Sequence, residues 1–197
     1  MEAAASSGRP PPGAEYLHAL VHLAVWDAVV SIQGGHEPYL GTVPVPGPAS
    51  LDAAVAAASY EVARVRIPAQ EAALAAQYAA HLATLPAGTE KENGVAVGLA
   101  AAQQLLAARA GDRFDATVPW VQPTPGTGVF EPAAPSTPVD TKLKEVAPLL
   151  PRAIDGYRPR GPARLGSRRY AEELEEVKAY GRMDGGTRGP AQTEVAQ

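Results

Sequence analysis

Two histidines and one carboxylate stand on the most apolar segment of the sequence. His18 and His22 are four residues apart, the spacing with which two imidazoles on one helix bind a metal ion. The zinc-protease form of this motif needs a glutamate at position 19, where this chain has Ala19, and no third ligand is evident. We therefore predict that both histidines are packed and hydrogen-bonded in a core.

Asp27 lies at the edge of the same apolar face. A carboxylate in that place has the chemistry of a general base. Burial without a partner would be costly, however, and buried polar groups in proteins are almost always hydrogen-bonded. The position therefore favours a buried carboxylate that accepts a hydrogen bond from a neighbouring helix or loop.

Arginines gather in the second half of the chain, six of them between residues 152 and 169. Guanidinium groups match phosphate and other oxyanions bidentately. Acidic residues follow at helical distance, so a solvated surface with bridges to those acids is the favoured interpretation. The alternative is a weak anion-binding group, and its members would be Arg158, Arg160, Arg164 and Arg168.

Other catalytic motifs are missing from the sequence. Gly126-Thr127-Gly128 lacks the third glycine and the strand–helix context of a dinucleotide loop. No nucleophile elbow and no Walker loop occurs, and all four histidines come before residue 82. No catalytic, cofactor-binding or metal-binding residue is therefore assigned.

Composition narrows the class of protein. The 197 residues suit one globular domain of ordinary size or part of a larger one. The absence of cysteine excludes disulfide scaffolds, Cys-ligated zinc and thiol catalysis, and it does not identify a compartment. Seventeen basic and 21 acidic residues give a net charge of −4, which provides no drive toward nucleic acid. The apolar stretch 17–32 is too short to span a bilayer comfortably, and no signal peptide is predicted.

Apolar periodicity predicts four consecutive helices, near 14–33, 50–66, 68–84 and 89–110. Gly34-Gly35 ends the first, Ser50 is an N-cap for the second, and Pro68 can start the third. Thr89-Glu90-Lys91-Glu92 has the form of a capping box for the fourth helix. Short connections then favour an all-α fold, an antiparallel helical bundle with a long Pro/Gly-rich loop.

The chain divides into four predicted parts: a flexible entry (1–13), a four-helix bundle core (14–111), a Pro/Gly-rich loop (112–138) and an Arg-rich segment with a charged helix (139–197). Trp120 and Phe130 favour a loop pinned onto the bundle over a free linker. Ser167 caps the charged helix, and the last residues, from Pro190, have the form of the first turns of a truncated helix.

The order of several phrases resembles a known family. In sequence they are His22–Val29 (HLAVWDAV), Glu37–Leu40 (EPYL), Asp52–Val55 (DAAV), Gly94–Gly98 (GVAVG), Ala108–Asp112 (ARAGD), Tyr157–Pro159 (YRP), Ser167–Ala171 (SRRYA), Glu176–Lys178 (EVK) and Gln192-Thr193. Their order and spacing, from about Ala14 to Gln197, resemble the amino-terminal half of bacterial proteins related to vanadium-dependent haloperoxidases. That family belongs to the superfamily of type 2 phosphatidic-acid phosphatases and bacterial acid phosphatases.

The resemblance implies an all-α fold in which a second helical bundle of complete members holds vanadate or phosphate. The family's ligands come from three motifs, K-x6-R-P, P-S-G-H and S-R-x5-H. None is present: the positions seven residues after Lys142 and Lys144 are Leu149 and Pro151, and no histidine follows Ser167-Arg168. No catalytic residue is carried over, and the resemblance implies a scaffold half that is inactive alone, whether its lineage is peroxidase or phosphatase.

Two functions from different classes remain open. One is the helical scaffold half of such a protein, whose partner is a carboxy-terminal catalytic half. The other is a stand-alone helical protein-interaction module. Ala-rich helix faces bury little area each, so we expect an exposed apolar patch and a tendency to self-associate or to bind a missing half.

Overall fold

A computed structural model describes residues 10–150, 156–157 and 160–195. The described residues form helices and no strands, which confirms the predicted all-α bundle with a long Pro/Gly-rich loop. They fall into two compact units, one ending at Ala147 and the other beginning at Pro148.

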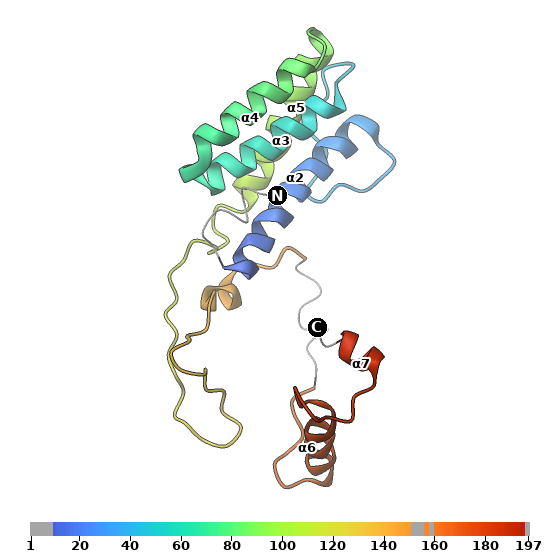
Figure 1. Ribbon diagram of the computed structural model, residues 1–197. Coiled ribbons are helices and arrows are strands. Elements are labelled where there is room, and N and C mark those ends of the chain that lie inside the picture. Colours follow the sequence, from blue (N-terminus) through green and yellow to red (C-terminus); the bar gives the residue numbers. More distant parts are fainter. Residues whose placement is uncertain (1–9, 151–155, 158–159, 196–197) are drawn as a thin grey trace. The chain divides into compact units, whose positions relative to one another are not determined.

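Three helices of the first unit pack on one another: α2 (Pro11–Gln33), α3 (Leu51–Arg66) and α5 (Thr89–Ala108). A 3-10 turn, η1 (Pro68–Gln70), leads from α3 into α4 (Glu71–Thr84). Helix α4 lies along α3 and contains no buried residue (Figure 1). The core is therefore built by three helices, and the fourth helix of the predicted bundle flanks it.

Small residues allow α3 and α5 to approach closely. Gly94 and Gly98 of α5 face Ala53 and Ala57 of α3, and all four residues are buried. A Cβ atom on Gly98 would overlap the backbone carbonyl oxygen of Ala54. The alanine and glycine content of these helices thus serves a short interhelical distance rather than a large buried area per residue.

Asp27 anchors the loop that follows α2. Its side chain is 1% exposed and accepts hydrogen bonds from the backbone N–H groups of Tyr39 (2.5 Å) and Leu40 (3.0 Å). Ser31, one turn further along α2, accepts a hydrogen bond from the N–H of Val43 at 2.9 Å. The prediction that Asp27 is a buried, hydrogen-bonded carboxylate is confirmed.

Two of the predicted helix ends are confirmed: the Ser50 side chain accepts a hydrogen bond from the N–H of Ala53, and Gly34 ends α2 with φ of 67°. Pro68 starts the 3-10 turn η1 instead of the third α-helix, which begins at Glu71. The predicted capping box is wrong, because Gly88 is the N-cap of α5 and no side chain caps that helix. Gly88 has φ of 135°, a backbone conformation that glycine tolerates, and this places Thr89 inside the helix, one residue too late to cap it.

The predicted flexible entry ends earlier than residue 13. Helix α2 begins at Pro11, because proline is compatible with the first turn of a helix, where its missing N–H is not needed. The N–H of Gly13 donates to Asp140 Oδ2 at 2.8 Å, which ties this first turn to a distant part of the chain. Residues 1–9 lie outside the described residues.

The Pro/Gly-rich loop is pinned by a different aromatic residue from the two predicted. Trp120 and Phe130 contact each other edge to face, with ring centroids 6.0 Å apart, and both are exposed. Phe114 is instead fully buried against Leu17 and Ile67. Phe114 comes six residues after the last residue of α5, whereas Trp120 and Phe130 stand farther along the Pro/Gly-rich loop.

The first unit also includes residues beyond the predicted boundary at 138. A 3-10 turn, η2 (Thr141–Glu145), packs Leu143 against the cluster around Phe114, and Val146 joins it. The N–H of Ala147 donates to the backbone oxygen of Asp112 at 3.0 Å. These contacts place the division of the chain after Ala147.

The second unit contains α6 (Arg168–Tyr180) and α7 (Pro190–Val195). The Ser167 side chain accepts a hydrogen bond from the N–H of Tyr170, which confirms the predicted cap, and Gly181 ends α6. Leu174 and Val177 form part of an exposed apolar stripe on α6.

Helix α2 is long and apolar enough to cross a membrane by length and composition, and it is the one such helix among the described residues. It has 23 residues, several more than the apolar stretch 17–32 singled out in the sequence. Core helices of bundles pass the same test, and α2 packs against both α3 and α5.

Candidate functional site: an apolar groove beside a buried ion network

Helices α2, α3 and α4 line a groove with a volume of about 880 Å³. This volume lies in the range of ligand-binding clefts, roughly 300 to 1,000 Å³. The lining residues are Leu17, His18, Val21 and His22 from α2; Val55, Ala56, Ser59, Tyr60, Val62, Ala63 and Arg66 from α3; Ile67 and Gln70 from the connection; and Ala73, Leu74, Gln77, Tyr78 and His81 from α4.

The groove exists because α4 rests on α3 and leaves α2 at a distance. Its lining positions on α4 recur three and four residues apart, and so do most of those on α3, so each helix contributes one continuous face. The rings of Tyr60 and Tyr78 stack with centroids 4.5 Å apart and join α3 to α4. Burial, then the charges of Tyr60 and Glu61, raise the pKa of Tyr78.

Three of the four histidines line this groove. His18 is half-buried and its Nδ1 lies 3.6 Å from a carboxylate oxygen of Glu15, whereas His22 and His81 are exposed. The prediction of two packed core histidines is therefore wrong for His22, because α4 packs against α3 and does not cover this part of α2. No three His, Asp or Glu side chains gather to hold a metal ion within the described parts of the chain.

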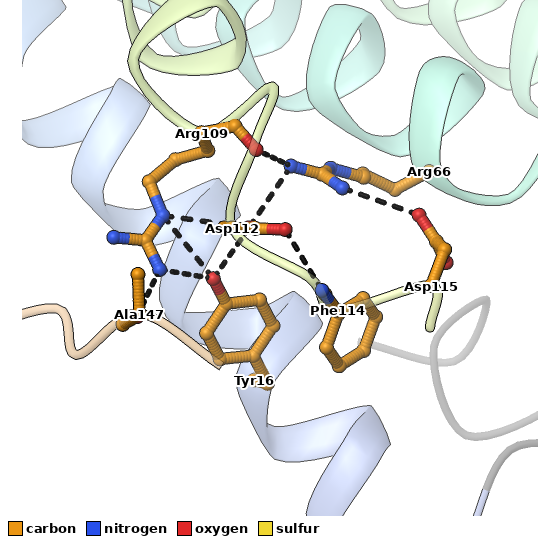
Figure 2. Close-up of polar contacts among 7 residues, drawn as sticks. All are labelled: Tyr16, Arg66, Arg109, Asp112, Phe114, Asp115 and Ala147. Atoms are coloured by element: carbon orange, nitrogen blue, oxygen red, sulfur yellow. Dashed lines mark hydrogen bonds and ion pairs between the residues drawn. The ribbon is translucent and has the colours of Figure 1, made fainter. Parts of the chain in front are cut away.

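Arg66, which lines the groove, also belongs to a buried ion network (Figure 2). Arg66 Nη2 lies 3.2 Å from Asp112 Oδ2 and 3.2 Å from the backbone oxygen of Arg109, and Arg66 Nη1 lies 3.4 Å from Asp115. The Tyr16 hydroxyl donates to Asp112 Oδ2 at 2.7 Å and accepts from Arg109 Nη2 at 2.6 Å. Arg109 also donates to the backbone oxygen of Ala147.

The environment of Asp112 stabilises its charged form. Burial alone would raise the pKa of this carboxyl group, but the N–H of Phe114, the Tyr16 hydroxyl and the charges of Arg66 and Arg109 outweigh it, and the pKa is lowered. Burial and then the hydrogen bond to Asp112 raise the pKa of Tyr16 to about 12. Asp112 is thus fully engaged by donors, so the network holds the ends of α2, α3 and α5 together and offers no free base.

The predicted anion-binding arginines belong to the part of the chain after Ala147, whereas the groove and the network are built by residues of the first unit. Arg158 lies outside the described residues, and Arg160 and Arg164 are exposed in the second unit. Arg168 pairs with Glu172 and Arg169 with Glu173, each with a nitrogen–oxygen distance of 2.6 Å. For these two arginines, the i,i+4 pairs agree with the favoured interpretation, a solvated surface with bridges to acidic residues. Anion binding by the predicted group of four arginines stays a prediction.

Sequence reasoning missed both the groove and the network. Arg66, Arg109 and Asp112 carry no motif, and only the phrase Ala108–Asp112 drew attention to two of them, without a role. One signal in the sequence could have predicted the network: charged residues stand at the ends of apolar helices, where the ends of two helices can lie together and their charged side chains can pair.

Comparison of the chain with models of protein families, with curated proteins and with solved structures finds no match in any of the three. The resemblance to haloperoxidase-related proteins therefore stays a prediction.

Proposed function

We propose that this chain is a helical scaffold that binds an amphipathic helix of a partner protein in the groove between α2, α3 and α4. The observation that carries the proposal is the shape of the groove, to which α2, α3 and α4 each contribute one continuous face. An amphipathic helix binds such a groove through apolar residues spaced three and four apart. The partly exposed apolar side chains of α4 that line the groove, such as Leu74, would be covered in the complex.

The order of family-like phrases supports one lineage for this scaffold, that of the haloperoxidase and acid-phosphatase relatives. In that lineage the partner would be the catalytic half that carries K-x6-R-P, P-S-G-H and S-R-x5-H. Sequencing the DNA downstream of codon 197 tests this part. An open frame that encodes the three motifs would support it, and a stop codon with no companion frame would favour the stand-alone interaction module.

The scaffold proposal also implies that the chain alone catalyses neither reaction of that superfamily. Phosphoryl transfer and vanadate-dependent peroxidation both need a positioned histidine and several cationic donors around one oxyanion. We expect no hydrolysis of an aryl phosphate and no bromination of a dye with vanadate, peroxide and bromide. Turnover that disappears in His18→Ala or His22→Ala would contradict the proposal.

Binding of a model helix tests the groove itself. The probe is a fluorescent peptide of about four turns with leucines along one face and glutamines on its flanks, and its anisotropy is measured with the full chain. Ala73 and Ala80 are both exposed alanines of α4, but only Ala73 lines the groove. Ala73→Glu places a charge against the apolar face and should weaken binding at least about tenfold.

Ala80→Glu is the matched control and should bind the peptide as the unaltered chain does. Absence of binding to the unaltered chain, or equal loss in the two variants, would overturn the groove as the binding site.

A further inference from the structure

We infer that the helix recognised by the groove is an acidic one, with glutamate or aspartate flanking its apolar face. This inference rests on the proposed function and specifies the partner. Its occupant is a helix of about three turns or more, because the lining positions of α4 and its connection run from Gln70 to His81, about 16 Å of helix axis.

The charge of the groove lining supports this choice. Its ionisable side chains, apart from two tyrosines, are His18, His22, His81 and Arg66, and no carboxylate is among the lining residues. Among the Lys, Arg, Asp and Glu side chains, the groove lining contains Arg66 and no acidic residue, whereas the chain as a whole has 21 acidic residues against 17 Lys and Arg. A lysine or arginine on the partner would find no carboxylate in the groove to pair with.

Two of the four groups already have acidic neighbours within the chain. Arg66 is held by Asp112 and Asp115, and His18 lies beside Glu15. His22 and His81 are exposed on different walls, one on α2 and the other on α4. A helix seated between these walls with an acidic residue on each flank would place a carboxylate near each imidazole, whose N–H groups donate hydrogen bonds.

Three peptides with the same leucine face test the inference, with glutamine, glutamate or lysine on the flanks. Binding of each to the full chain is measured by anisotropy at pH 6 and low salt. We expect the glutamate peptide to bind at least about tenfold more tightly than the lysine peptide, and the ratio to shrink as salt rises. Equal binding of these two peptides, or tighter binding of the lysine peptide, would overturn the acidic partner while leaving helix docking intact.

Variants identify the residues responsible. His22→Gln combined with His81→Gln should reduce the ratio between the affinities for the glutamate peptide and the lysine peptide to about threefold or less. The double variant removes both imidazoles and leaves the apolar lining residues unchanged. His36→Gln is the control, since His36 is the one histidine that does not line the groove, and it should leave the ratio unchanged. An unchanged ratio in the double variant would overturn the assignment of the preference to the groove.

Two further results separate this inference from other occupants. If none of the three peptides binds, the proposed function fails and this inference fails with it. If sedimentation shows a dimer of the chain that Ala73→Glu abolishes, the occupant is a second copy, and the acidic partner helix is overturned.

Discussion

At the scale of single residues, the stability of the first unit depends on the hydrogen bonds and ion pairs that the buried carboxylate of Asp112 receives. Asp112 is 4% exposed and receives donors from α2, α3 and the turn after α5. A buried carboxylate without such donors destabilises the folded state. Removing one donor should therefore lower the free energy of unfolding of the first unit. Tyr16 is the donor whose removal changes the shape of the core least, because phenylalanine keeps its stacking on Phe114.

Tyr16→Phe should lower the free energy of unfolding by about 1 to 2 kcal/mol near pH 8, the cost of one hydrogen bond to a buried charged group. The pKa of Tyr16 in the folded state is about 12, above the value of about 10 for an unfolded tyrosine. A raised pKa contributes stability below pH 10 that is lost as the pH rises toward 12. Urea unfolding of both proteins should therefore show the difference between them shrinking from pH 10 to pH 12, and a constant difference would contradict this role.

At the scale of helices, the close contact between α3 and α5 leaves no room for a larger side chain at Gly98. Gly98→Ala should destabilise the protein by about 1 to 3 kcal/mol, because the added methyl group overlaps the carbonyl oxygen of Ala54. This loss exceeds the gain of about 1 kcal/mol in helix propensity that alanine normally brings. The matched control is Gly111→Ala, whose Cβ would meet nothing within 4 Å, and it should be close to neutral. Urea unfolding checks both, and equal effects would show that the helices separate easily.

The helices were predictable from the sequence, and the groove was not, for a physical reason. Periodic apolar residues and caps such as Ser50 act within one helix, so they are visible in a local stretch of sequence. The groove depends on the distance between α2 and α4, which is set by which helix α4 packs against. The exposure of Trp120 was not predictable for the same reason. Its aromatic side chain favours contact with the bundle, but in the folded chain it is exposed and contacts Phe130.

At the scale of the whole molecule, the extent of the first unit is a consequence of long-range contacts. A chain of residues 1–147 should be more stable than one of residues 1–138 by about 2 to 4 kcal/mol. The shorter chain loses the bond from Gly13 to Asp140, the acceptor for Arg109 at Ala147 and the packing of Leu143 and Val146. Urea unfolding of the two chains checks this, and equal stability would place the boundary at residue 138 as the composition of the sequence indicated.

In the proposed complex, a partner helix lies between α2 and α4. Helix α4 has no buried residue and packs along α3, so its backbone amides should exchange hydrogen quickly in the free chain. A helix seated in the groove would cover the lining faces of α2 and α4 without touching α5.

Hydrogen exchange measured with and without the glutamine-flanked peptide tests where the helix binds. We expect slower exchange along α4 and around His18 and His22 when the peptide is bound, with little change in α5. Protection confined to α5, or no protection in α4 when binding is saturated, would contradict it.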